Sequence, residues 1–450
     1  MAKIQSEDLG VLPINKLLVR QALPASIGIL VMSLNILVDT IFVGHWIGST
    51  AIAAINVVLP VTFFIAALGM SIGIGGSSII SRAMGAHDKE KAFLTFGNQI
   101  TLTLLLTITL VIFGLWFIDD IIPLFGGKGI IFEPAKIYYR IVLYGTPILA
   151  MSMVGNNVAR AEGKPKFSMY AMMMPSVGNL VLDYLFINLF DWGMQGAAWA
   201  TTISYGFSFL YLLWFFLSKN SELKINISHF GLNLNLVKEI ASLGFVTLSR
   251  QAVVSVTYLL MNNILFNLGG ATSVTAYAIV GRMLMFAMFP VLGVTQGFLP
   301  IAGFNYGARN YTRVRKSINT AIKYASILAT IVFLFLMIFP IFITKLFTTD
   351  AEVISQTPSA MRWVFAATPI IAIQLIGSAY FQAIGKAKSA LLLTLTRQGF
   401  FFIPLIFLLP NFYGEFGVWV SFPIADVLST IVTAYFLNKE IRKNLILRTE

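Results

Sequence analysis

Long apolar runs, separated by short stretches rich in glycine, proline or charged residues, recur along the whole chain. A helix needs roughly 20 apolar residues to cross a hydrocarbon core of about 30 Å, and the runs reach this length. Short alternating segments, which are typical of membrane β-strands, do not occur. The pattern therefore predicts an all-α polytopic membrane protein with about twelve transmembrane helices.

The expected spans of the first half are residues 17–43, 52–80, 93–118, 135–159, 167–189 and 197–217. Those of the second half are residues 240–268, 274–303, 317–343, 358–382, 389–409 and 417–437. Composition agrees with this pattern, because the chain is 57% hydrophobic and only 11% charged, with a mean hydropathy of +0.83. A water-soluble domain of ordinary proportions could not bury that much apolar surface.

The residue content argues against several kinds of site and activity. The chain has no cysteine, which excludes disulfides and thiolate metal sites, and His45, His87 and His229 fall in predicted connections. No P-loop and no HExxH motif occurs, so we expect no ATP-driven pumping, no enzyme activity and no cofactor. The N-terminal stretch shows no small-residue cleavage pattern, so we expect a retained first helix rather than a signal peptide.

The distribution of positive charge indicates a membrane topology. A net charge of +12 would suggest a nucleic-acid partner in a soluble protein. Here, however, most of the 31 Lys and Arg residues fall in the termini and in alternate connections, such as 82–91, 160–166, 219–238 and 309–323. Because basic residues gather on the cytoplasmic side, we expect a multi-pass protein of the cell membrane with both termini cytoplasmic, and no nucleic-acid partner.

An internal repeat becomes visible when the sequence is shifted along itself by 222 residues. Matching glycines, prolines and lysines are harder to attribute to chance than matching leucines, so they predict a duplication. The pairs include Gly75 with Gly297, Pro147 with Pro369, Gly163 with Gly385 and Lys164 with Lys386.

The duplication predicts two similar six-helix lobes, residues 1–217 and 239–450, joined by a cytoplasmic linker at residues 218–238. Each lobe holds an even number of helices, so both insert in the same orientation and are related by a pseudo-two-fold axis along the membrane normal. Two such bundles around a central cavity suit a transporter that works by alternating access.

Several segments, in this order and spacing, resemble a known family. They are Pro24, VDTIFVGHWIGSTAIAA (38–54), GIGGSSIISRAMGAHDKEKA (73–92), ARAEGKPK (159–166), GVTQGFLPIAGFNYGARNYTRVRKS (293–317) and FQAIGKAKSA (381–390). The chain resembles MATE (multidrug and toxic compound extrusion) exporters over essentially its whole length, and within them the DinF-like, archaeal-type arrangement. The resemblance implies a V-shaped pair of lobes, antiport driven by H+ or Na+, and multidrug efflux of amphipathic, often cationic compounds. We expect a monomer in the lipid bilayer.

Three acidic residues, Asp39, Asp183 and Asp426, fall inside predicted spans. A charge at the bilayer centre costs about 2.5–3.5 kcal/mol on insertion scales, so each of these acids is a functional hypothesis. Asn179 and Asp183 are four residues apart and share one helix face, and Thr201 lies one turn into the following helix. In the family that the chain resembles, the positions that match Asp39, Asn179, Asp183 and Thr201 form the cation site.

This cluster has more than one chemical interpretation. Two carboxylates in a poorly solvated pocket repel each other, so that they can exchange a proton near neutral pH. Alternatively, carboxylate, amide and hydroxyl oxygens coordinate a hard cation such as Na+. In a third interpretation Asp39 is simply solvated at the interface and Asp183 pairs with a neighbouring donor.

The second half lacks equivalent acids. The shift of 222 residues pairs Asp39 and Asp183 with Met261 and Leu405, and no Asp or Glu occurs in residues 240–349. Other members of the family carry acids in this half. The difference puts a cation site in the second lobe in doubt.

Three arginines, Arg250, Arg282 and Arg397, accompany Asp426 at membrane depth in the second half. In one interpretation Arg397 or Arg282 neutralises Asp426. In the other, the arginines line a cavity and shape its electric field. Arg250 stands near a helix start, where a long side chain can also extend toward the interface.

Four further residues are candidates for the transport machinery. Pro24 removes a hydrogen bond from the first helix, and the resemblance implies a bend there. Asn156 and Asn157 can join the polar network or make ordinary interhelical hydrogen bonds. Met172 is a candidate for lining the cavity, although methionine in a membrane helix also serves as packing.

A rival function is a flippase for a lipid-linked saccharide, because such proteins are similar in fold to the exporters. A flippase of this kind is expected to use a large basic cavity rather than a small acidic pocket. The arginines of the second half keep this alternative open.

Overall fold

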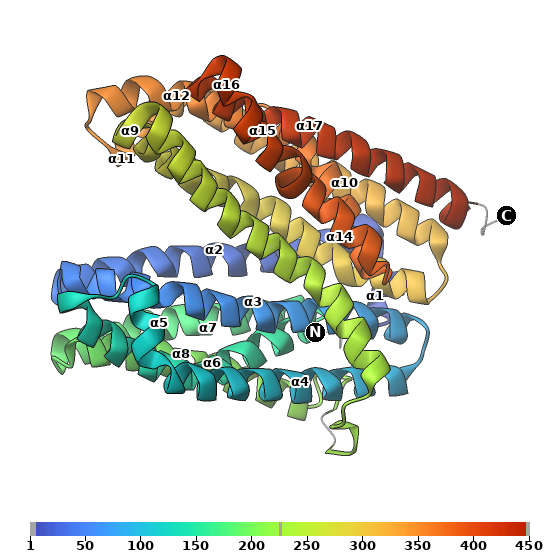
Figure 1. Cartoon of the computed structure of the whole chain (residues 1–450). Coiled ribbons are helices and arrows are strands. Elements are labelled where there is room, and N and C mark those ends of the chain that lie inside the picture. The colour runs from blue at the N-terminus through green and yellow to red at the C-terminus, as the bar shows by residue number, and fades with distance from the viewer. Residues whose placement is uncertain (1–5, 225–226, 447–450) are drawn as a thin grey trace. The chain divides into compact units, whose positions relative to one another are not determined.

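The structure is a computed structural model that describes residues 6–224 and 227–446. Within these residues every regular element is helical, as Figure 1 shows. In this described part of the chain, eleven helices are long and apolar enough to cross a membrane. One of them, α9 (Leu234–Gly307), has 74 residues and breaks at Gly270, where φ is 65° and ψ is −153°. A straight helix of this length would measure about 110 Å, so α9 makes two passes and the described part of the chain has the expected twelve spans.

The spans of the first half lie close to their predicted positions. They are α2 (Ile14–Trp46), α3 (Ser49–Gly85), α4 (Lys89–Trp116), α6 (Phe132–Ala161), α7 (Pro165–Asp183) with its π-helical extension η2 (Tyr184–Leu189), and α8 (Gly193–Leu217). Short elements connect them: α1 (Asp8–Val11), α5 (Ile118–Leu124), η1 (Gly129–Ile131) and η3 (Ile227–His229). The long helices of this half run roughly parallel in Figure 1.

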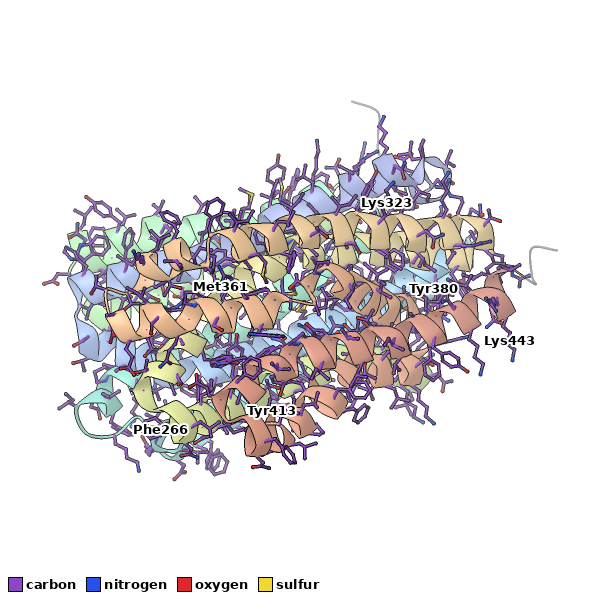
Figure 2. All side chains as sticks on the ribbon, turned by 90° about the horizontal axis from the view of Figure 1, so that it is seen from above. Phe266, Lys323, Met361, Tyr380, Tyr413 and Lys443 are labelled. Atoms are coloured by element: carbon purple, nitrogen blue, oxygen red, sulfur yellow. The ribbon has the colours of Figure 1, made fainter. Side chains whose placement is uncertain are left out.

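The spans of the second half also include short breaks. After α9 follow α10 (Tyr311–Ile338), α11 (Pro340–Phe347), α12 (Ala351–Phe365), η4 (Thr368–Ile370), α13 (Ile371–Ala383), α14 (Ala387–Leu395), η5 (Thr396–Phe402), α15 (Ile403–Leu408), α16 (Pro410–Tyr413), α17 (Glu415–Glu440) and η6 (Ile441–Ile446). Figure 2 shows their side chains, among which Met361 and Tyr380 are fully buried while the rings of Phe266 and Tyr413 are exposed.

Several helices extend beyond the apolar runs that predicted them. Helix α4 begins four residues before its predicted span, because the Asp88 side chain caps it by accepting a hydrogen bond from the Lys91 amide at 3.0 Å. Helix α10 begins at Tyr311, where Asn310 caps it in the same way through the Arg313 amide. Hydropathy detects only the segment embedded in lipid, whereas polar caps set the true helix ends.

The backbone confirms the internal repeat. Residues at positive φ recur at the spacing of 222: Gly48 with Gly270, His87 with Arg309, and Gly163 with Gly385. Left-handed backbone is uncommon outside glycine, yet His87 and Arg309 adopt φ of 57° and 55°. The helix caps Asp88 and Asn310 follow them at the same spacing. The two halves therefore share their turn geometry even where the residue types differ.

Packing divides the chain into two compact units. Unit 1 contains the residues up to Val11 and Ile27–Thr247, and unit 2 contains Leu12–Ser26 and the chain from Leu248 onward. Residues 12–26 and 239–247 thus pack with the helices of the other half, whereas the predicted lobes follow the order of the chain. Both α2 and α9 pass from one unit to the other within their first half, after Ser26 and after Thr247.

Two glycines of the repeat permit the close packing of these crossing segments. A Cβ atom on Gly75 of α3 would collide with the carbonyl oxygen of Ile240 in unit 1. A Cβ atom on Gly297 would lie 2.7 Å from the backbone nitrogen of Ala22 in unit 2. Only glycine allows two backbones to approach so closely.

The connection after α6 anchors the start of the linker in unit 1. The fully buried Glu162 side chain accepts hydrogen bonds from the Ser221 hydroxyl at 2.6 Å and from the amides of Glu222 and Leu223 at 3.2 Å. Burial raises the pKa of Glu162 to about 7, and these hydrogen bonds to its charged form limit the rise.

Replacing Gly75 with alanine tests the close approach. The new methyl group meets backbone atoms that cannot rotate away, so we expect the Gly75→Ala protein to lose about 1–3 kcal/mol of stability. Thermal unfolding of the purified protein in detergent measures this loss. Gly206 of α8 is the matched control, because a Cβ there meets nothing within 4 Å. Equal thermal midpoints for Gly75→Ala and Gly206→Ala would contradict the interpretation.

Candidate functional site

A cavity of about 270 Å³ lies inside unit 1, between α2, α3, α6, α7 and α8. Apolar side chains make up much of its wall, including Met32, Val43, Leu59, Phe63 and Met172. Its polar lining includes Asn35, Asp39, Tyr138, Asn156, Asn179 and Thr201. The cavity therefore combines an apolar surface with one ionisable acid.

Asp39 and Asp183 come together in unit 1. Asp39, from the C-terminal half of α2, lines the cavity, whereas Asp183, the last residue of α7, is fully buried behind it. Neither carboxylate oxygen of Asp183 receives a hydrogen bond, although the Asp39 carboxyl and the Asn179 amide approach it. Asn179 is the neighbouring side chain that can donate to Asp183, so the interpretation in which Asp183 pairs with a neighbouring donor stays open beside the cation site.

Asn179 and Thr201 lie in the same cavity as Asp39. The Asn179 side-chain oxygen accepts a hydrogen bond from the Asn35 amide at 3.1 Å. The Thr201 hydroxyl donates to the Ala197 carbonyl at 3.0 Å. The structure thus brings together the four side chains that the resemblance assigns to a cation site.

Two members of this cluster were not predicted. Asn35 precedes Asp39 by one helical turn, so a search of the same helix face would have found it. Tyr138 lies 3.5 Å from the Thr201 hydroxyl, but its position in α6 follows no spacing that links it to the acids. Only the packing of α6 against α8 identifies Tyr138.

Asn156 and Asn157 hold a buried arginine in the last turn of α6. Arg160 donates to the Asn156 and Asn157 side-chain oxygens at 2.7 and 3.1 Å, and Asn156 also accepts from the Ser168 hydroxyl at 2.8 Å. Arg160 is only 5% exposed, although the basic pattern places it in a connection. Asn156 lines the cavity, so this polar network forms part of its wall, whereas Asn157 lies outside the lining.

Met172 and Pro24 relate to α2 in different ways. A Cβ on Gly28 would lie 2.8 Å from the Met172 sulfur, so α2 and α7 pack closely beside the cavity that Met172 lines. Pro24 stands inside the continuous helix α2, two residues before Ser26, where the helix leaves unit 2.

The charged residues of unit 2 form a separate group. Arg397 and Asp426 form an ion pair with an N–O distance of 2.6 Å. Arg282 is instead exposed and stacks over the Phe347 ring at 5.8 Å. Of the two candidate partners, Arg397 is therefore the one that pairs with Asp426, and neither arginine lines the cavity of unit 1.

Comparison with protein families matches the MatE model twice, over residues 24–185 and 248–408. The chain belongs to the MatE family. The two matches agree with the internal duplication, and the family consists of transporters rather than enzymes.

Individual relatives match over nearly the full length. The multidrug export protein MepA of Staphylococcus haemolyticus is 27% identical over 431 residues, which cover 96% of this chain and 94% of MepA. A solved MATE structure in the bent conformation has 28% identity, full coverage of both chains and a TM-score of 0.93. A MOP superfamily transporter from Pyrococcus furiosus has 29% identity, coverage of 98% and 99%, and a TM-score of 0.91.

Removing the Asn35 amide tests whether its hydrogen bond orients Asn179 in the cluster with Asp39 and Asp183. Asn35→Ala leaves the buried Asn179 oxygen without its donor, so we expect the apparent affinity for H+ or Na+ to fall by about 5- to 10-fold. Titration of intrinsic tryptophan fluorescence with pH and with Na+ measures this change. Asn56→Ala is the control, since Asn56 lines the same cavity but makes no hydrogen bond in the described part of the chain. An unaltered titration in Asn35→Ala would remove Asn35 from the site.

Proposed function

We propose that this MatE transporter exports amphipathic, mainly cationic compounds in exchange for H+ or Na+, and that the exchange is coupled through Asp39, Asn179, Asp183 and Thr201. The names of the MepA relatives support multidrug export. The cavity supports the substrate class, because apolar walls suit the body of an amphipathic molecule and Asp39 suits its positive charge. The protein works in the cell membrane, with both termini in the cytoplasm.

The observation that carries the proposal is the unpaired Asp183 carboxyl. Both of its oxygens are buried and receive no hydrogen bond, although the Asn179 amide is near, and a second carboxyl, Asp39, lies beside it. Two negative charges in such a place strongly repel each other, and water cannot solvate them. We therefore expect a proton or a Na+ ion to bind at the pair during the transport cycle.

The exchange of substrate for ion results from competition for one negative charge, that of Asp39. A cationic substrate in the cavity compensates the charge of Asp39, and a bound H+ or Na+ compensates the same charge. Loading one therefore weakens the binding of the other, and this negative coupling is what an antiporter requires. The amide and hydroxyl oxygens of Asn179 and Thr201 favour Na+, whereas two adjacent carboxyls also suit a shared proton.

The neutral substitution Asp183→Asn should abolish gradient-driven export while leaving the fold intact, because the amide keeps the shape but cannot exchange a proton or balance a cation. Efflux of ethidium from proteoliposomes under an imposed pH or Na+ gradient measures the effect, and we expect a loss of at least tenfold. Asp120→Asn is the control, since Asp120 is an exposed acid in α5.

Export at the control rate by Asp183→Asn would place the coupling site elsewhere. Comparison of the two gradients identifies the coupling ion. A wild-type protein that moves a labelled lipid-linked saccharide but no ethidium would instead support the flippase.

We propose in addition that Pro24 is a hinge of α2. Proline cannot donate to the carbonyl four residues earlier, so the helix has a weak point where it passes from unit 2 to unit 1. Asp39 lies about four turns further along the same helix. Occupancy of the acid pair can therefore bias two arrangements of the intervening segment.

Pro24→Ala separates the hinge from the cation site. We expect efflux to fall severalfold, because a straight helix is stabilised, while the fluorescence response to cations stays unchanged. Asp39→Asn should weaken both. Unaltered efflux in Pro24→Ala would exclude the hinge, and an unaltered cation response in Asp39→Asn would exclude Asp39 from the site.

A further inference from the structure

A second hollow of unit 1 lies between α7 and α8, outside the acidic cavity. It is an open groove of about 430 Å³, lined by Met174, Val177, Gly178, Phe207, Leu210 and Tyr211. The tyrosine hydroxyl is the one hydrogen-bonding side-chain group in this set. The groove therefore suits an apolar ligand rather than an ion or a polar substrate.

The periodicity of α7 shows which way the groove faces. Met172, Ser176 and Asn179 line the acidic cavity, whereas Val177 and Gly178 line the groove. In a helix with about 3.6 residues per turn, these two sets occupy opposite faces. Val177 is 55% exposed, so the groove opens onto the lipid and not into the cavity.

The packing of α7 against α8 gives the groove its shape. A Cβ atom on Gly178 would lie 2.5 Å from the Phe207 ring, so glycine is what lets the ring come so close. On the cavity side, the buried Ser208 hydroxyl of α8 donates to the Ala171 carbonyl of α7 at 2.7 Å. The two helices are thus held together without a ligand, and a preformed groove binds with a smaller loss of conformational entropy.

Aromatic rings surround the end of the groove nearest to the start of α7. The centroid of the Tyr211 ring lies 6.3 Å from that of Phe167 and 5.7 Å from that of Trp214. The Phe167 and Phe215 ring centroids are 4.5 Å apart, so the start of α7 packs beside the end of α8. Tyrosine and tryptophan are enriched at membrane–water interfaces, and we therefore place this end of the groove near the lipid headgroups.

Two exposed lysines stand at the same end. Lys166 is the second residue of α7, next to Phe167, and Lys219 comes two residues after the end of α8. Among the described residues, 6–224 and 227–446, neither lysine side chain has an ion-pair or hydrogen-bond partner. The acids nearest to them in the sequence, Glu162 and Glu222, already accept hydrogen bonds within unit 1.

We propose that the groove binds an acyl chain of an anionic phospholipid, whose phosphate is held by Lys166 and Lys219. Residues 174–178 lie about 12–18 Å along α7 from Lys166, and the hydrocarbon of one leaflet is about 15 Å deep. A chain attached to a phosphate at the lysines therefore reaches the groove. Lysines near the membrane surface attract anionic lipids, which favours these over zwitterionic ones. This lipid site does not depend on the proposed export of cations.

Native mass spectrometry of the full chain tests the charge preference. The protein is released from nanodiscs with equal amounts of phosphatidylglycerol and phosphatidylcholine that carry identical acyl chains, and we expect it to retain phosphatidylglycerol preferentially. Lys166→Gln and Lys219→Gln should each lower the ratio of retained phosphatidylglycerol to phosphatidylcholine about fivefold. Lys89→Gln is the control, since Lys89 is an exposed lysine at the start of α4 in the same unit.

Filling the groove tests the acyl chain. Val177→Phe should reduce the retention of both lipids severalfold. Val181→Phe is the matched control, because Val181 is also 55% exposed and stands one turn further along α7, outside the lining. Should Val177→Phe not fold, Leu210→Trp fills the groove from α8.

Three results would each overturn the lipid site. The first is equal retention of the two lipids by the wild type, which indicates a non-specific lipid shell only. The second is a lipid ratio in both lysine variants that matches Lys89→Gln. The third is retention by the groove-filling variant that matches Val181→Phe.

Discussion

Lipid cannot solvate a charge, and this constraint governs the functional parts of the molecule. A charged side chain at membrane depth must find a partner in the protein or bind one from outside. Asp426 and Arg397 satisfy the requirement within unit 2 through an ion pair. Asp39 and Asp183 do not, because two carboxyls face each other and Asp183 receives no hydrogen bond. The proposed exchange function follows from this difference, because a mobile cation would supply the partner that Asp39 and Asp183 lack.

A second constraint acts on the backbone, because α2 and α9 each belong to both packing units and must pack closely in each. The close approaches at Gly75 and Gly297 allow the crossing segments of α9 and α2 to pack directly against their neighbours. Pro24 then places a missing hydrogen bond at the point where α2 changes unit. In this duplicated chain, α2 and α9 therefore each contribute residues to both packing units.

The sequence alone was sufficient to predict the membrane spans, the internal duplication and the family. Hydropathy indicates whether a segment is surrounded by water or by lipid. In lipid the backbone must satisfy its own hydrogen bonds, so an apolar run of about 20 residues forms a helix. Paired glycines such as Gly163 and Gly385 revealed the repeat because both occupy a left-handed turn, which glycine adopts without strain. The spacing of Asn179 and Asp183 placed both on one helix face, and the family resemblance then joined them to Asp39.

Only the tertiary structure determined which groups meet across helices. The contact of Asn35 with Asn179, the burial of Arg160 and the choice of Arg397 over Arg282 all depend on how each helix is rotated about its axis. Periodicity defines the faces of one helix, but in a membrane apolar residues cover nearly every face, so the pattern gives little information on rotation. Side-chain packing between neighbouring helices settles that rotation, and with it the identity of each charge partner.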